Sequence, residues 1–394
     1  MSTDLKREAP AARPLKGGNP FAHLEADLES LSALGRRRSL DCSMGHDFSS
    51  NDYLGFANSP ELREAAIEAA CRRIPVGAGG SRLLRGNHPE HEALEEAAVR
   101  YFGAESALYF GTGYAANLTL FATAPQRGDL VVYDQWIHAS VHDGMRRGRA
   151  EIACAPHNSA QGIEDAIVRW RANGGTGRIW IAVESLYGMD ADAPNLEELA
   201  TLADHWAAIL IIDEAHATGV LGPNGRGRAA FLEGRENVVT VHTCGKAIGT
   251  AGAFICGPRV LKEFLVNRGR PFIFSTAPPP LIAAVTRVAM SLCARGDVRR
   301  VRLQQLVQCA HQELKRSFGL TGSGSHILPI MIGEDAAAVE LASKIRARGY
   351  DVRAIRPPTV PVGTARLRIA LTLNVNEAAI EGLFEALQFE RALG

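Results

Sequence analysis

The chain has 394 residues, of which 46% are hydrophobic and 22% charged, and its 43 basic residues balance its 43 acidic ones. This length suits two domains with large cores, and the absence of net charge gives no support for a polyanionic partner such as nucleic acid.

The seven cysteines are scattered and never in CxxC spacing, which favours free thiols in a reducing compartment over disulfides or structural zinc. The first 20 residues are rich in Pro, Gly and charge and lack the apolar core of a signal peptide. No stretch reaches the roughly 18 apolar residues of a membrane span. We therefore expect a cytoplasmic protein that makes no membrane contact, with residues 1–50 forming an N-terminal arm and helix.

A glycine-containing turn, GTGYAAN (111–117), follows the apolar stretch SALYF and opens a predicted helix. Backbone N–H groups at such a helix start can hold a phosphate. Read literally, the turn is also GxGxxA with Asp134 ending the next strand, which leaves a dinucleotide-binding oxidoreductase as a remote alternative.

His138 and His142 in HASVH have the spacing of metal ligands on one helix face. The acidic residue of HExxH is missing and no third ligand is near, so the pattern does not favour a metal site. The alternative to a metal-binding role is that each histidine simply forms ordinary hydrogen bonds within the protein.

Three chemistry-bearing residues come at or just past the ends of apolar strands: Glu184 after RIWIAV, Asp213 after AAILII, and Lys246 after VTVHT and a short turn. The strand and helix rhythm is that of a parallel sheet, in which ligands bind at the carboxyl ends of the strands. This set suits pyridoxal phosphate (PLP), whose ring nitrogen needs an acid and whose aldehyde needs an amine. Asp213 is the strand-end acid, His216 follows three residues later, and Lys246 comes after the next strand.

Beyond a Pro-rich turn at 271–280, one long helical pattern from about Leu281 to Phe318 marks the passage to a smaller domain. The alternating strand ARLRIAL (365–371) places Arg366 and Arg368 on the same face. We expect a large domain over residues 51–285 and a small α+β domain over residues 286–394.

Three stretches, DEAHATGVLGPNGRG (213–227), HTCGKAIGTAGA (242–253) and IRPPTVPVGTARLRI (355–369), resemble the α-oxoamine synthases, which are PLP enzymes of fold type I. The resemblance runs from about SSNDYLGF (49–56) to the end of the chain. It implies a large α/β domain with a mainly parallel central sheet, a smaller C-terminal domain, and a homodimer with shared active sites.

The resemblance also implies roles for single residues. Lys246 would carry the cofactor aldehyde and act as the base, Asp213 would hold the pyridine nitrogen, His216 the phenolic oxygen, and His138 would stack on the ring. Cofactor contacts are further expected from Gly113, Tyr114, Thr243 and Glu184, and from Ser275 and Thr276 across the dimer. Substrate contacts are expected from Arg36, Asn51, His138, Thr359 and Arg366.

Two residues depart from the family pattern: Gly188 stands where a serine commonly bonds the phenolic oxygen, and Ala191 stands where glycine is usual.

The implied activity is decarboxylative condensation of an amino acid with an acyl thioester. The stretch 355–369 favours members that use L-alanine and a pimeloyl thioester, carried by CoA or an acyl carrier protein, in biotin biosynthesis over those that use glycine or serine. A transaminase and a catalytically silent PLP-binding protein remain alternatives.

Overall fold

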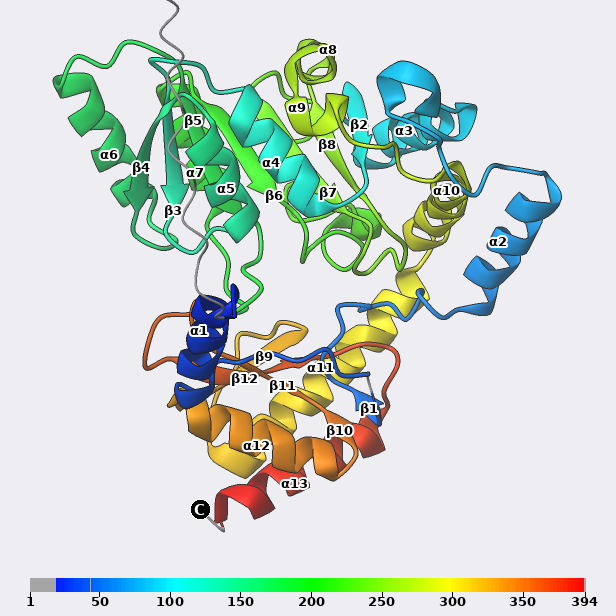
Figure 1. Cartoon of the computed structure of the whole chain (residues 1–394), viewed down its shortest axis with the longest axis vertical. Coiled ribbons are helices and arrows are strands. Elements are labelled where there is room, and N and C mark those ends of the chain that lie inside the picture. The colour runs from blue at the N-terminus through cyan, green and yellow to red at the C-terminus, as the bar shows by residue number, and fades with distance from the viewer. Residues whose placement is uncertain (1–18, 43, 393–394) are drawn as a thin grey trace, which may run out of the picture.

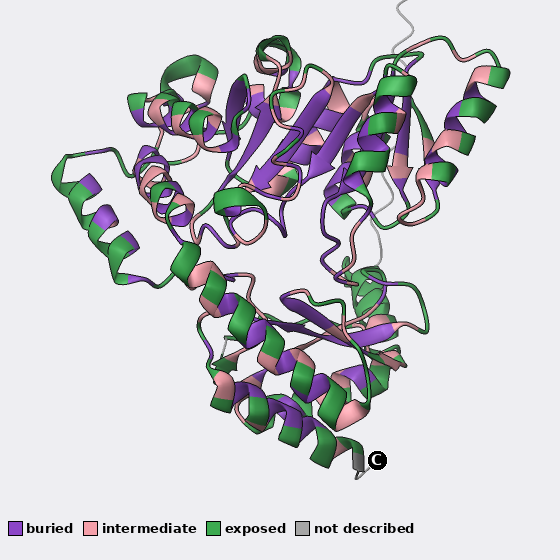
Figure 2. Ribbon diagram, turned by 180° about the vertical axis from the view of Figure 1, so that it is seen from behind, coloured by how far each residue is buried: buried purple, intermediate pink, exposed green. Residues whose placement is uncertain are grey.

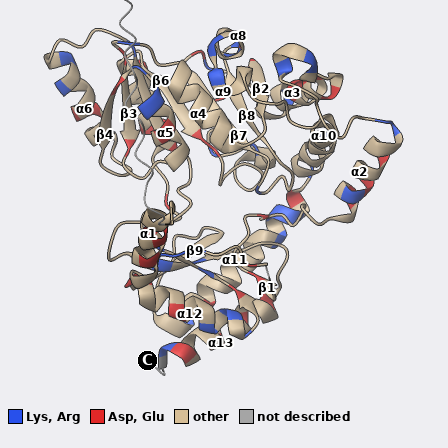
Figure 3. Cartoon of the chain, in the orientation of Figure 1, with Lys and Arg blue, Asp and Glu red and all other residues tan. Residues whose placement is uncertain are grey.

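A computed structural model describes residues 19–42 and 44–392, so most of the predicted N-terminal arm lies outside the described residues. The chain forms an upper body around a seven-stranded sheet and a lower body around a three-stranded sheet (Figure 1). Charged residues of both signs are spread over both bodies (Figure 3). In the described part of the chain, every helix is too short or too polar to cross a bilayer.

The upper sheet has the order β2-β8-β7-β6-β5-β3-β4. All pairings from β4 to β7 are parallel, and β8 runs antiparallel to both of its neighbours. The mainly parallel sheet predicted from the sequence is confirmed. Its strands are β2 (Ser106–Phe110), β3 (Leu130–Asp134), β4 (Glu151–Ala155), β5 (Ile179–Glu184), β6 (Ile209–Asp213), β7 (Val238–Thr243) and β8 (Ala253–Gly257).

Helices cover both faces of this sheet, so its central strands are buried (Figure 2). On one face Ile163 and Leu199 join the core, and on the other Leu120 and Val141 do so. Apolar residues on both sides of each strand explain the uninterrupted hydrophobic runs. The helices of this body are α2 (Pro60–Cys71), α3 (Pro89–Phe102), α4 (Gly113–Thr123), α5 (Ala139–Arg147), α6 (Ala160–Ala172), α7 (Leu196–His205), α8 (Arg259–Arg268), α9 (Arg270–Ile273) and α10 (Pro280–Ala294), with short turns η1 (Arg82–Gly86) and η2 (Pro223–Gly225).

The lower body packs helices on an antiparallel sheet of order β11-β12-β9. Its elements are α11 (Asp297–Phe318), β9 (Ile327–Gly333), α12 (Asp335–Ala347), β10 (Tyr350–Asp351), β11 (Arg353–Ile355), β12 (Ala365–Ala370) and α13 (Glu377–Ala392). The N-terminal part of the chain joins this body, because β1 (His46–Asp47) pairs with β10.

One predicted element is wrong in detail. The long helix expected from Leu281 to Phe318 is two helices, α10 and α11, which are separated at Arg295 and Gly296. Glycine is a poor helix former and permits the break. The expected domain division after residue 285 falls inside α10, and we propose instead that the small domain begins at the break.

The helix expected within residues 1–50 is α1 (Ala22–Ala33), and it has no buried residue. The apolar side chains of Leu24 and Leu28 on α1, and of its cap residues Phe21 and Leu34, are 41% to 62% exposed. Contiguous exposed apolar side chains of this kind mark an interaction surface.

Candidate active site

Lys246 follows β7 in the turn that the sequence predicted. Its Nζ lies 3.0 Å from Nε2 of His216. Burial lowers the pKa of Lys246 to about 8, while Asp213, and next Glu184, oppose the shift. An amine with this pKa has a substantial neutral fraction near pH 8, which is the form that reacts with a carbonyl.

Two carboxylates face the same space from neighbouring strands. Asp213 ends β6 and Glu184 ends β5, and the two are register partners. Asp213 accepts hydrogen bonds from Asn117 Nδ2 at 2.8 Å and from the backbone N–H of Ala215 at 2.9 Å. Burial, and next the charge of Asp213, raise the pKa of Glu184 to about 8. The site therefore holds an anchored carboxylate beside an acid that stays protonated near neutral pH.

The start of α4 provides free N–H groups on the same side of the sheet. Thr112 caps the helix by accepting from the backbone N–H of Ala115 at 3.0 Å, and the N–H groups of Gly113 and Tyr114 before it belong to the first turn, which has no intrahelical acceptors. A Cβ on Gly113 would lie 2.8 Å from Cγ2 of Thr243. Glycine thus lets the helix start approach Thr243 and leaves an anion-binding end.

His138 is fixed at the start of α5. Its Nδ1 accepts the backbone N–H of Ser140 at 3.2 Å and lies 2.7 Å from the Ser140 hydroxyl. His138 is an exposed residue, yet desolvation of its ring lowers the pKa, with Asp213 opposing and Lys246 adding to the shift. A neutral ring with an open face is suited to stacking.

His216 is buried and has partners at both ring nitrogens. Nδ1 lies 2.7 Å from the Tyr53 hydroxyl, opposite the nitrogen that meets Lys246. Burial, and next the charge of Lys246, hold the pKa of His216 well below its usual value. The Tyr53 hydroxyl also donates to Asn51 Oδ1 at 2.9 Å. Tyr53 was not predicted from the sequence, and its signal was its place two residues after Asn51 in SSNDYLGF.

The departure at Gly188 has a geometric counterpart. A Cβ at this position would lie 2.2 Å from Nε2 of His216, so His216 occupies the space that a side chain at 188 would need. The departure at Ala191 also has a geometric counterpart. This buried residue adopts a left-handed backbone with φ of 61°, a conformation that glycine adopts without steric cost.

The two arginines of β12 are both buried but differ in their partners. Arg366 forms an ion pair with Asp190 and donates from Nε to the carbonyl of Thr364 at 3.0 Å. Arg368 donates to the carbonyl of Gly188 at 2.6 Å and to Asn51 Oδ1 at 2.9 Å, and in the described part of the chain it forms no ion pair. Its charge also lowers the pKa of both His216 and Lys246. Asp190 thus neutralises the charge of Arg366, the arginine predicted to contact the substrate. The charge of Arg368 has no acidic partner among the described residues.

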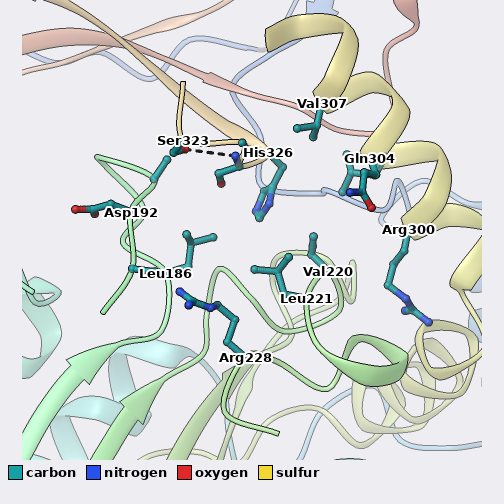
Figure 4. Close-up of a pocket in the computed structure, with 15 residues that line it drawn as sticks. Leu186, Asp192, Val220, Leu221, Arg228, Arg300, Gln304, Val307, Ser323 and His326 are labelled. Carbon is teal, nitrogen blue, oxygen red and sulfur yellow. Dashed lines mark hydrogen bonds between the residues drawn. The ribbon is translucent and has the colours of Figure 1, made fainter. Parts of the chain in front are cut away.

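A cavity of about 520 Å³ lies between the two bodies next to this network (Figure 4). His326 points into it, and Nε2 of this buried ring has no hydrogen-bond partner among the described residues. The His326 ring also packs edge-on against Tyr53, with centroids 4.1 Å apart. His326 therefore connects the cavity to the residues around His216.

The remaining predicted residues are placed as follows. Arg36 pairs with Asp335 at 2.6 Å on the small domain. Thr359 is exposed in a turn before β12. Ser275 and Thr276 are exposed after α9. None of these contacts the Lys246 cluster by a hydrogen bond among the described residues, so their predicted substrate and cofactor roles stay predictions.

The side chains fit PLP. The α4 start and Thr243 suit its phosphate, Asp213 its ring nitrogen, His138 its ring face and Lys246 its aldehyde. The buried Asn117 Oδ1 beside Asp213 has no partner among the described residues, as expected of a polar site built for a further group. Fold and site together define a PLP-dependent enzyme of fold type I.

Comparison with known proteins agrees with this class. The family model described as aminotransferase class I and II matches residues 44–387, and the chain belongs to this family. An 8-amino-7-oxononanoate synthase of Anaeromyxobacter dehalogenans is 42% identical over 92% of this chain and 94% of its own. Among solved structures, SPT with PLP has a TM-score of 0.85 at 27% identity, covering 95% of this chain and 98% of that one. The 8-amino-7-oxononanoate synthase of Francisella tularensis has a TM-score of 0.73 at 26% identity, covering 90% and 99%. The predicted resemblance to α-oxoamine synthases is confirmed.

Proposed function

We propose that this protein condenses L-alanine with a pimeloyl thioester, releasing carbon dioxide and the free thiol and forming 8-amino-7-oxononanoate for biotin synthesis. The observation that carries PLP chemistry is the placement of Lys246, 3.0 Å from His216, beside the anchored strand-end acid Asp213. The likeness to relatives of that name supports the choice of substrates.

In this proposal the chain's own residues position the substrate and move protons. Bound PLP supplies an electron sink for the negative charge that develops at the amino-acid Cα. The guanidinium of Arg368 binds the α-carboxylate as a bidentate donor, and Asn51 holds that guanidinium in place. Fixing the carboxylate would fix which Cα bond faces Lys246, which is a positioning effect.

Lys246 takes the proton from Cα, because its neutral amine is available near pH 8. Its 3.0 Å contact with His216 orients Nζ. After the new carbon–carbon bond forms, the thiolate leaves, the carboxylate departs as carbon dioxide, and Lys246 returns a proton to Cα. Asp213, held by Asn117 and Ala215, would hold the ring nitrogen of PLP.

We further propose a homodimer in which Ser275 and Thr276 reach the partner's cofactor phosphate. Both are exposed on their own chain, and the neighbouring Phe274 is 72% exposed. Light scattering gives the mass directly, and a monomer in the presence of PLP would end this part of the proposal. A cytoplasmic location stays a prediction, supported by seven free thiols.

The test of function is thiol release by the PLP-loaded enzyme over a panel of amino acids and acyl thioesters, with Lys246→Ala as the inactive control. We expect release with L-alanine and pimeloyl thioester together, and none with either alone. A transaminase would instead convert L-alanine to pyruvate without any thioester. Thiol release that is unchanged in Lys246→Ala would end the proposed mechanism.

A further inference from the structure

Loop 185–192 follows β5 and carries contacts that place both arginines of β12. The carbonyl of Gly188 accepts a hydrogen bond from Arg368 Nε at 2.6 Å, and Asp190 forms the ion pair with Arg366. Because both contacts come from one loop, the position of the loop sets where the two guanidinium groups lie. The residues that hold this loop therefore bear on how a substrate carboxylate is bound.

Hydrogen bonds within the loop close it into one turn. The backbone N–H of Tyr187 donates to the carbonyl of Asp192, and that of Ala191 donates to the carbonyl of Tyr187, both at 2.9 Å. A turn closed in this way moves as a unit, so a contact that fixes Asp192 also fixes Gly188. The Asp192 carboxylate turns away from the neighbouring cavity (Figure 4) and meets the ring of His157.

His157 lies between two carboxylates and two aromatic rings. Its Nδ1 is 2.8 Å from Asp134 Oδ1, and its Nε2 is 2.8 Å from Asp192 Oδ2. The ring stacks on Trp136 with centroids 4.1 Å apart, and it lies edge-on to Tyr187 at 4.5 Å. The His157 side chain is only 11% exposed. Contacts at both nitrogens and with both neighbouring rings hold this imidazole in one orientation.

The two carboxylates make His157 a cation near neutral pH. Only the protonated imidazole can donate from both nitrogens at once. Burial alone would lower the pKa of His157, but the hydrogen bonds with Asp134 and Asp192 outweigh it and raise the pKa to about 9. Each contact is therefore a charge-assisted hydrogen bond, which is stronger than a neutral one.

Asp134 is the fixed end of this arrangement. It ends β3, its side chain is 2% exposed, and it accepts from the backbone N–H groups of Trp136 at 2.9 Å and Asn158 at 2.7 Å. His157 follows β4 and Asp192 follows β5, and the three strands are neighbours in the order β5-β3-β4. His157 thus joins the loop beyond β5 to the buried end of β3.

We propose that His157 is a positioning residue for the amino-acid substrate. By joining Asp192 to the buried Asp134, it holds loop 185–192 in place, and through the carbonyl of Gly188 it holds Arg368 where this arginine binds the carboxylate. His157 forms no hydrogen bond with Arg368 itself among the described residues, so it acts through the loop. The role in substrate binding rests on the proposed function.

The experiment uses the PLP-loaded enzyme and the variants His157→Gln and Asp192→Ala. His157→Gln leaves the buried Asp134 without its cation, whereas the Asp192 side chain is 40% exposed and its removal leaves the core intact. Asp192→Ala therefore decides the outcome if His157→Gln does not fold. The matched control is Asp204→Ala on α7, which removes a carboxylate that is 50% exposed from its ion pair with Arg235.

The first measurement is the Kd for L-alanine, from titration followed by cofactor absorbance. We expect this Kd to rise about fivefold or more in both variants, because a charge-assisted hydrogen bond that holds the loop is lost. The Kd for PLP should stay within about twofold, because Lys246 and Asp213 are unchanged, and the control should match the wild type in both constants. An unchanged Kd for L-alanine in Asp192→Ala would overturn the proposal, as would an equal loss of PLP affinity.

A double variant tests whether the two residues act through one contact. Removal of Asp192 should add less than about twofold to the effect of His157→Gln on the Kd for L-alanine. Effects that multiply in full would show that the two residues act separately, and this would also overturn the proposal.

Hydrogen exchange of loop 185–192 separates this inference from the proposed function. We expect the backbone N–H groups of Tyr187 and Ala191 to exchange about fivefold faster or more in both variants, and at the wild-type rate in Asp204→Ala. Unchanged exchange would show that His157 does not hold the loop. If the wild-type absorbance does not respond to L-alanine, the proposed function fails, and the exchange rates alone decide whether His157 holds the loop.

Discussion

Glu184 and Asp213 stand side by side as register partners at the ends of β5 and β6. Two carboxylates in this arrangement cannot both ionise at low cost. Asp213 has two hydrogen-bond donors, whereas the pKa of Glu184 is raised to about 8. The pair therefore divides into a carboxyl group anchored by hydrogen bonds, Asp213, and an acid that keeps its proton near neutral pH, Glu184.

This division predicts how stability depends on pH in the cofactor-free protein. Between the ordinary pKa of 4.5 and about 8, the folded state keeps a proton on Glu184 that the unfolded state loses. The contribution of Glu184 to stability is therefore full at low pH and declines as pH rises through this window. In Glu184→Gln this decline should be absent. Urea denaturation at pH 5, 6.5 and 8 measures it, and a stability difference between variant and wild type that does not grow with pH would contradict the raised pKa.

Arg368 forms no ion pair among the described residues, so we predict that it is the arginine that binds the amino-acid carboxylate. Arg368→Lys loses the bidentate fork and should raise the apparent Kd for L-alanine about 10- to 100-fold, which corresponds to roughly 1.4–3 kcal/mol. Titration of the PLP-loaded enzyme with L-alanine, followed by cofactor absorbance, measures this Kd. Arg366→Lys is the matched control on the same strand, and a larger effect there would return the role to Arg366.

Gly188 predicts a steric effect on His216. In Gly188→Ala the new methyl group meets the His216 ring, which must turn away from Lys246. We expect kcat to fall about 10- to 100-fold, as a displacement of about 1 Å in a catalytic group can cause, together with a shifted cofactor absorbance band. Gly77→Ala is the control, because a Cβ there meets nothing within 4 Å. If Gly188→Ala kept the wild-type kcat and absorbance, the position of His216 would not depend on the absence of a side chain at residue 188.

Tyr53 predicts a stability effect that is independent of activity. Tyr53→Phe leaves Nδ1 of the buried His216 without its 2.7 Å partner, and an unsatisfied buried polar group costs about 1–3 kcal/mol. Denaturation of the cofactor-free protein measures this loss of unfolding free energy. The control is His142→Phe, which replaces a half-buried histidine of α5. An equal loss of unfolding free energy in this control would remove the special role of Tyr53.

The residues that sequence alone placed well are those governed by one rule. Glu184, Asp213 and Lys246 each follow an apolar run, and parallel strands put their carboxyl ends at one edge. The helix starting at Gly113 followed from the glycine turn after an apolar strand. For these residues local pattern and topology agree, so their position at one edge of the sheet could be predicted without coordinates.

The residues that were missed depend on contacts between distant segments. Alternation along β12 put Arg366 and Arg368 on one face but could not show that Asp190 neutralises only the first. The contact between Tyr53 and His216 spans 163 positions, and periodicity carries no information over that range. The break between α10 and α11 at Gly296 was missed because the apolar pattern continues across it.

The pairing of β1 with β10 joins an N-terminal segment of the chain to the small domain. The carboxylate of Asp47 accepts from the backbone N–H of Ser50 at 2.9 Å, which stiffens the short stretch from β1 to Asn51. Any rotation of the small domain would consequently drag Asn51 and Tyr53 with it. Substrate binding by Arg368 and the orientation of His216 would then change together.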